Sequence, residues 1–151
     1  MSPIKPRPLP RVFVDADVLF AGSASPSEHS ASQVILRMAE ITLIKALISE
    51  QVFTEVERNL AAKLPQALPN FRHLVDRCLQ IVPDTTSELI NSHRGKADPK
   101  DLPLLVVAAC ENCNWLVTFN LVHYQPGLVE VTVLRPGNFV LLVRDLLMQL
   151  T

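Results

Sequence analysis

The chain has 151 residues, of which 48% are apolar and 19% are charged, and its formal net charge is −1. These values exclude a disordered chain, and they exclude a protein held on nucleic acid by bulk positive charge alone. No apolar run approaches the roughly 18 residues of a membrane span, and the start of the chain lacks a secretory apolar stretch. We therefore expect a single cytoplasmic domain that does not enter a membrane.

The first 60 residues alternate between strand and helix patterns. Prolines at positions 3, 6, 8 and 10 make residues 1–10 an extended lead-in, so the folded domain is expected over residues 11–151. Consecutive apolar residues in the string RVFVD predict a buried strand over residues 11–15. The other elements predicted here are a helix over residues 27–40, a strand over 41–49 and a helix over 52–60.

The rest of the chain continues this alternation. The elements predicted there are helices over residues 70–80, 99–113 and 139–147, strands over 81–83, 115–119 and 128–134, and an exposed loop over 92–98. Strands that alternate with helices predict a mostly parallel central sheet covered on both faces, which is a three-layer α/β/α sandwich. Ligands bind such sheets beyond the carboxyl ends of the strands, so residues just after each strand are the first candidates for function.

Two aspartates follow the first predicted strand. Asp15 and Asp17 come directly after three apolar residues, where an ionised group is costly unless water, a hydrogen bond or a cation meets it. Either carboxylate could instead cap the next helix by accepting its backbone N–H groups. The residues alone leave both interpretations open.

A second acidic group lies in the string ADPKDLP, which contains Asp98 and Asp101. Both could cap the following helix or interact with its dipole, but two carboxylates at this spacing also suit oxygen ligation of a hard divalent cation. Glu55 lies at the border of the apolar stripe in helix 52–60. An ordinary ion pair with Arg58 would explain it equally well.

The string VTFNLVHY places Asn120 and His123 after strand 115–119, at the same predicted sheet edge as Asp15. Asn120 could simply shape a turn, and His123 could be a surface residue. Their position nevertheless makes them candidates for the same site.

Together these residues resemble the PIN-domain family, metal-dependent ribonucleases that include the VapC-type toxins of toxin–antitoxin pairs. The resemblance covers the chain from about residue 11 to residue 143, and it rests on an ordered set of short matches. The matching positions are Asp15, Asp17, Val18 and Leu19, then Ser49 and Glu55, then Asp98, Pro99 and Asp101, then Val117 and Thr118, and finally Pro136.

The resemblance implies catalysis by Asp15, Glu55 and Asp101, which would hold Mg²⁺ or Mn²⁺ together with Asp98. It implies supporting roles for Asp17, Ser49, Thr118, Asn120 and His123. A cation held by carboxylates lowers the pKa of water and stabilises charge at a phosphoryl group, which is the chemistry of phosphodiester hydrolysis. On this basis we expect Asp15→Asn to abolish RNA cleavage without unfolding the protein, because the site would face water.

The resemblance also implies an RNA substrate, a homodimer and an antitoxin partner. The terminal helix, with Phe139 and Leu146, is expected to contribute to the dimer. Basic residues that could contact RNA phosphates are Arg58, Arg94, Lys96 and Lys100, although the same residues could be an ordinary solvated surface.

Two alternatives to a PIN ribonuclease remain open, and the first comes from a departure from the family pattern. Asn120 stands where many relatives have a fourth aspartate, and His123 stands near it, so less negative charge remains for a second ion. The chain could therefore be a non-catalytic PIN-like module that binds RNA or protein. The opening VFVDADVL also resembles haloacid-dehalogenase phosphatases, in which the first aspartate is a nucleophile. That resemblance does not explain Glu55 or the ADPKD string.

The cysteines indicate no redox or zinc chemistry. Cys110 and Cys113 form a C-x-x-C pattern that closes a predicted helix, whereas a reactive pair opens one. We predict that these cysteines and Cys78 are buried structural residues.

Overall fold

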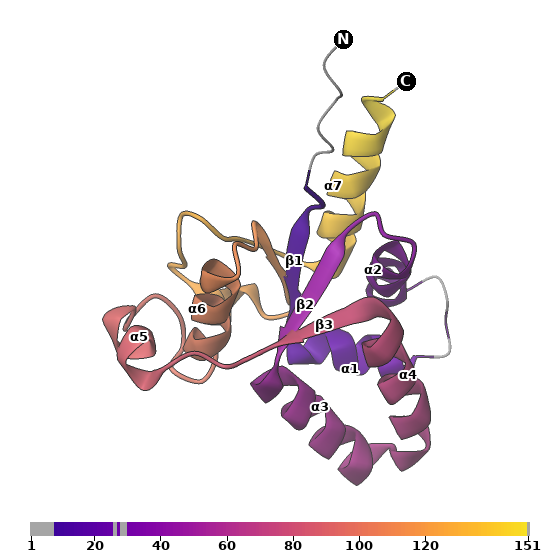
Figure 1. Cartoon of the computed structure of the whole chain (residues 1–151), viewed down its shortest axis with the longest axis horizontal. Coiled ribbons are helices and arrows are strands. Elements are labelled where there is room, and N and C mark those ends of the chain that lie inside the picture. The colour runs from indigo at the N-terminus through magenta and orange to yellow at the C-terminus, as the bar shows by residue number, and fades with distance from the viewer. Residues whose placement is uncertain (1–7, 26, 28–29, 151) are drawn as a thin grey trace.

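The computed structural model describes residues 8–25, 27 and 30–150. Its centre is a five-stranded sheet in which every neighbouring pair of strands is parallel (Figure 1). The strands are β1 (Arg11–Val14), β2 (Lys45–Ser49), β3 (Leu79–Val82), β4 (Trp115–Val117) and β5 (Thr132–Leu134), and their order across the sheet is β3-β2-β1-β4-β5. The predicted parallel sheet is confirmed.

Helices cover both faces of this sheet and complete the predicted α/β/α sandwich. The helices are α1 (Ala16–Ala24), α2 (Ala31–Glu40), α3 (Glu50–Lys63), α4 (Leu68–Cys78), α5 (Ser87–Ser92), α6 (Leu102–Cys110) and α7 (Pro136–Met148), with 3-10 turns η1 (Pro65–Ala67) and η2 (Leu121–Tyr124). Helices α1 to α4 and α7 contact one another in one layer, and α5 contacts α6 in the other (Figure 1).

The layers meet on the central strands, which are buried beyond their first residues. Val12, Phe13 and Val14 of β1 have no exposed surface, because strands of a parallel sheet are covered from both sides. Helix α6 supplies a nearly continuous buried run, Leu104–Ala108, and its residues are apolar on all sides. The core therefore packs around β1 and β4.

Two helices were not expected from the sequence. Helix α1 has almost no amphipathic period, because it packs against α2, α3 and α4 and needs no polar face. Helix α5 is a single short stretch with no buried residue, so it carries no apolar stripe. Four other elements start later than predicted. Helix α2 starts after its capping residue Ser30, and α6 starts after a turn that ends at Asp101. Strand β2 starts at Lys45 and β5 at Thr132, each four residues later than the apolar pattern predicted. Residues 1–7 of the predicted lead-in lie outside the described residues, and Pro8–Pro10 form no regular structure.

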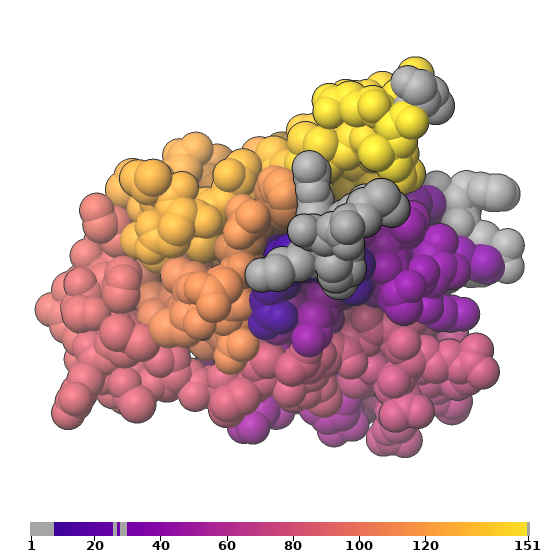
Figure 2. Space-filling model, turned by 45° about the horizontal axis from the view of Figure 1, so that its top comes forward, coloured from indigo at the N-terminus to yellow at the C-terminus, as the bar shows by residue number. Residues whose placement is uncertain are grey.

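Helix α7 protrudes from the body at its C-terminal end (Figures 1 and 2). Its inner face buries Phe139 completely against Trp115, so the prediction that Phe139 forms part of a dimer surface is wrong. Leu146, Leu147 and Met148 are exposed on the protruding end. Among residues 8–25, 27 and 30–150, no helix is both long and apolar enough to span a bilayer.

The three cysteines are free thiols. Cys78 and Cys113 are buried, as predicted, and burial raises the pKa of Cys113 to about 12. Cys110 is exposed, so the prediction is wrong for this residue, because α6 ends there and the chain leaves the core.

Candidate functional site

The candidate residues gather at the carboxyl ends of β1 and β4. These strands are neighbours, and the Asp15 N–H donates to the Val117 carbonyl at 3.0 Å, which continues their pairing one residue beyond β1. The helix that follows β1 lies on one face of the sheet, and the helix that precedes β4 lies on the other. The β1–β4 boundary is therefore the point where an open parallel sheet forms a natural crevice.

Asp15 is held by hydrogen bonds on both carboxylate oxygens. Its Oδ1 accepts from the Ala16 N–H at 2.6 Å, which makes Asp15 the N-cap of α1. Its Oδ2 accepts from the Thr118 hydroxyl and from the Tyr124 hydroxyl, each at 2.8 Å. Asp15 is only 6% exposed, so the expectation that it faces open water is wrong. An Asp15→Asn change would set an amide N–H₂ against one of these donors and would disturb folding as well as chemistry.

Asp17 follows Asp15 after β1, and its carboxylate accepts hydrogen bonds from residues that follow β4. Its Oδ2 accepts from the Phe119 N–H at 3.0 Å and from Asn120 Nδ2 at 3.1 Å. Its Oδ1 is buried and has no hydrogen-bond partner among the described residues. Burial, together with the charge of Asp15, raises the pKa of Asp17 to about 6. Asp17 is thus a carboxylate whose ionised form lacks compensation on one oxygen.

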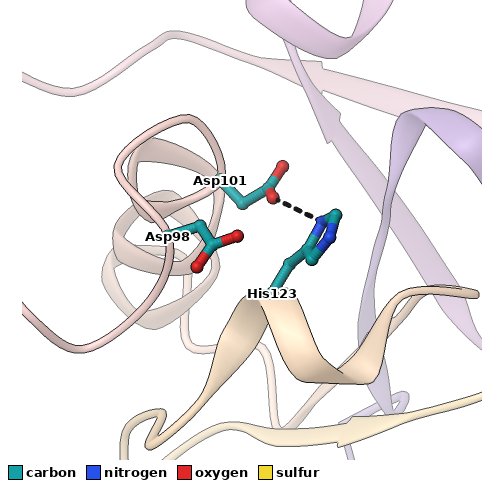
Figure 3. Close-up of side chains that lie close together, drawn as sticks. All are labelled: Asp98, Asp101 and His123. Atoms are coloured by element: carbon teal, nitrogen blue, oxygen red, sulfur yellow. Dashed lines mark ion pairs between the residues drawn. The ribbon is translucent and has the colours of Figure 1, made fainter.

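Asp98, Asp101 and His123 form a cluster of potential metal-ligating side chains (Figure 3). One potential ligand atom from each lies within 4.8 Å of the others. His123 Nδ1 is 3.2 Å from Asp101 Oδ2, an ion pair when the imidazole is protonated. The Asp98 N–H donates to the His123 carbonyl at 2.8 Å, which fastens η2 to the segment before α6. Burial and the nearby Asp15 raise the pKa of Asp101.

The capping role considered for this acidic pair is not observed. Helix α6 begins at Leu102, after Asp101, and the Asp101 side chain caps no described backbone group. Asp98 contributes its backbone carbonyl instead, which accepts from the N–H groups of Asp101 and Leu102. The Asp101 carboxylate is half-buried, and Asp98 is exposed.

Glu55, on helix α3, lines the same cleft as the other acidic residues. Ser49 ends β2 fully buried, and its hydroxyl accepts from the Val52 N–H at 3.3 Å, so it caps the helix that carries Glu55. Ser49 acts through that cap and does not line the cleft. A cleft of about 170 Å³ is lined by Asp15, Ala16, Asp17, Glu55, Asp98, Lys100, Asp101, Asn120 and His123. Five carboxylates from separate parts of the chain therefore converge on one small volume.

A wider groove opens next to this acidic cleft. Its volume is about 680 Å³, and it shares Glu55 and Lys100 with the cleft. Basic side chains of Arg58, Lys63 and Lys100 line it, together with Glu50 and Asp84. Arg94 and Lys96 are exposed but line neither space, so the structure separates the four predicted basic residues into two pairs.

Tyr124 is the site residue that sequence reasoning missed. It is the only tyrosine of the chain, it is 2% exposed, and its hydroxyl contacts Asp15. Burial and the negative charges around it raise its pKa, which favours the neutral hydroxyl that donates this hydrogen bond. A signal was present in the sequence, because Tyr124 directly follows the candidate His123 at the strand end. An aromatic residue there is normally interpreted as core packing.

Comparison with solved structures supports the same fold. VapBC2 from Rickettsia felis, in a structure bound to a DNA fragment from its promoter, superposes with a TM-score of 0.63 at 17% identity, covering 83% of this chain and 98% of the other. The sarcin-ricin loop cleaving toxin VapC20 of Mycobacterium tuberculosis superposes with a TM-score of 0.54 at 16% identity, covering 80% of this chain and 98% of that chain.

Sequence comparison adds the family. A search of curated proteins finds no sequence match. The model of the PIN domain matches residues 11–121, which include β1 to β4 and every acidic residue of the cleft. This match favours the PIN interpretation over the phosphatase alternative. Over most of its length, therefore, this chain belongs to the PIN domain family.

Proposed function

We propose that the protein is a metal-dependent ribonuclease that hydrolyses RNA phosphodiesters. The observation that carries this proposal is the convergence of five carboxylates on one cleft at the β1–β4 boundary. Asp15, Glu55 and Asp101 are the proposed catalytic ligands, and Asp98 joins them. Membership of the PIN domain family supports this activity.

The residues of the cleft fit a hard divalent cation such as Mg²⁺ or Mn²⁺. The donor set is dominated by carboxylate oxygens, which these ions prefer. The buried Asp17 Oδ1 lacks a partner, and the pKa values of Asp17 and Asp101 are both raised. Clustered negative charge that is incompletely compensated is what a cation would neutralise.

The other residues of the cleft would then support the metal ligands. The bound cation supplies positive charge that activates water and stabilises the attacked phosphate. His123 orients Asp101 through Nδ1, and Asn120 orients Asp17 through its amide. Thr118 holds Asp15 in place, and Lys100 stands where the cleft meets the wider groove.

RNA cleavage with and without metal tests this proposal. We expect cleavage of single-stranded RNA in Mn²⁺ or Mg²⁺, and none in excess chelator. Asp101→Asn should abolish cleavage while the protein stays folded, because the Asp101 side chain makes no cap hydrogen bond to α6 and its contact with His123 can be kept by an amide oxygen. Asp76→Asn, the same chemical change on exposed surface of α4, is the matched control. Wild-type cleavage by Asp101→Asn, or cleavage in chelator, would refute the proposal. Mn²⁺ binding without cleavage of any RNA would favour the non-catalytic module.

We place the RNA strand in the groove beside α3. Arg58 and Lys100 line this groove and can pair with phosphates, whereas Arg94 and Lys96 do not line it. Arg58→Ala should raise the KM for RNA and lower the salt dependence of binding by about one phosphate contact. Arg94→Ala is the control and should change neither quantity. Equal effects of the two changes would contradict this path.

The partners are also part of the proposal. We propose a toxin that an antitoxin neutralises, and the likeness to VapBC2 supports it. Expression of the wild-type chain in bacteria should then stop growth, and Asp101→Asn should relieve the arrest.

We further propose a homodimer that includes the exposed end of α7, where Leu146 and Leu147 border an apolar hollow of about 100 Å³. Light scattering at micromolar concentration should give twice the chain mass, and Leu147→Glu should reduce it to a monomer.

A further inference from the structure

We infer that Tyr124 is a positioning residue of the metal site: its hydroxyl holds Asp15 so that the carboxylate presents Oδ1 alone to the cation. This inference rests on the proposed metal-dependent function. It assigns a purpose to a buried polar group that the family match does not explain, because the match ends at residue 121.

The hydrogen bonds around Asp15 carry the inference. A carboxylate offers about four acceptor positions, two on each oxygen. Oδ2 is occupied by the hydroxyls of Thr118 and Tyr124, both at 2.8 Å. Oδ1 receives only the Ala16 N–H, at 2.6 Å. One acceptor position therefore remains without a described donor, and it belongs to Oδ1.

The position of Tyr124 is determined by the fold around it. Tyr124 is the last residue of η2, and its ring is buried in the core. Two backbone bonds fasten this segment to the loop before α6, from Asp98 N–H to the His123 carbonyl and from Gly127 N–H to the Lys96 carbonyl, each 2.8 Å. The hydroxyl is therefore presented to Asp15 by backbone that also carries part of the acidic cluster.

The chemistry of the contact favours orientation over proton transfer. The ring is buried and its hydroxyl lies behind Asp15 at Oδ2, not among the residues that line the cleft, so Tyr124 orients the carboxylate without touching the reacting atoms. Groups that hold metal ligands from behind typically change metal affinity by about 10- to 100-fold when they are removed. Tyr124→Phe removes the hydroxyl alone and leaves the ring to fill its place.

Calorimetric titration of Mn²⁺ tests the inference on the whole chain without reference to catalysis. We expect Tyr124→Phe to weaken Mn²⁺ binding by about 10-fold. The Mn²⁺ concentration for half-maximal RNA cleavage should rise by a similar factor, and saturating Mn²⁺ should restore a rate close to that of the wild type. A residue that only stabilises the fold would show no such recovery.

Val143→Ala serves as the control, because it truncates a buried side chain of α7 and leaves every contact of Asp15 intact. It should lower the unfolding temperature and leave Mn²⁺ affinity unchanged. Unchanged Mn²⁺ affinity in Tyr124→Phe would overturn the inference and leave the proposed nuclease standing. Absence of Mn²⁺ binding by the wild-type chain would overturn both.

Discussion

Thr118→Val is the substitution that most directly tests how the two aspartates after β1 are held. Thr118 is fully buried, and its hydroxyl donates to Asp15 Oδ2 at 2.8 Å while accepting from the Asn120 N–H at 3.0 Å. Valine keeps the shape of the side chain and replaces the hydroxyl by a methyl group. The change therefore removes the donor to Asp15, which also lies 3.4 Å from Asp17 Oδ2, and the acceptor for the Asn120 N–H, without opening a cavity.

The expected loss of stability follows from these two bonds. A hydrogen bond to a charged group contributes about 1.5–3 kcal/mol, and a bond between neutral groups contributes about 0.5–1.5 kcal/mol. The free energy of unfolding should fall by about 2–4 kcal/mol, because the donor to a buried carboxylate and the acceptor for Asn120 are lost together. For a domain of this size, such a loss corresponds to a decrease of about 5–12 °C in unfolding temperature.

Thermal unfolding followed by circular dichroism, with chelator present, measures this effect without a metal contribution. Thr118→Ser keeps the hydroxyl and should retain most of the wild-type unfolding temperature. Combining Thr118→Val with Tyr124→Phe should give a non-additive loss, since both hydroxyls act on the same oxygen of Asp15. An unfolding temperature of Thr118→Val equal to that of the wild type would refute the hydrogen-bond network described here.

Three further predictions concern stability. The pKa of Asp17 is about 6 in the folded chain and 3.8 ordinarily, so between these two pH values the folded state binds more protons than the unfolded state. Metal-free stability should therefore fall as the pH rises from about 4 to about 6, and Asp17→Asn should flatten this slope in unfolding measurements. Gly127 has a φ of +81°, and an added Cβ would lie 3.0 Å from the Tyr124 carbonyl oxygen. Gly127→Ala should cost about 1–2 kcal/mol or more in urea unfolding, whereas Gly137→Ala, which meets nothing, should be neutral or stabilising. Ser49→Ala should cost about 1 kcal/mol through loss of the α3 cap, and an unchanged midpoint would contradict that role.

The layers of the fold were predictable because most elements carry a one-sided apolar pattern. Helices α2 and α4 face the core along one stripe, and β1 is apolar from Val12 to Val14. Helix α1 was missed because it is enclosed on all sides, so its sequence has no stripe to detect. Periodicity reports exposure to water, and an element without such exposure leaves no periodic signal.

The site was predictable in its location but not in its contacts. Strand ends indicated where Asp15, Asp17 and Asn120 would meet, because parallel strands finish at one edge of the sheet. The bond from Tyr124 to Asp15 joins residues 109 positions apart, and it depends on how η2 packs against the loop before α6. No local pattern encodes such a contact. The same limit explains why Asp15 was expected in water although three donors enclose it.

The strand order has a consequence for when the site first exists. Strand β1 pairs with β2 and with β4, and β4 is made about one hundred residues later in the chain. A growing polypeptide that has completed β1, β2 and β3 holds Asp15 and Glu55 but still lacks Asp101, Thr118 and Tyr124. The acidic cleft can therefore assemble only after α6, β4 and η2 have been synthesised. If the proposed function holds, activity waits until that late segment has joined the strands made before it.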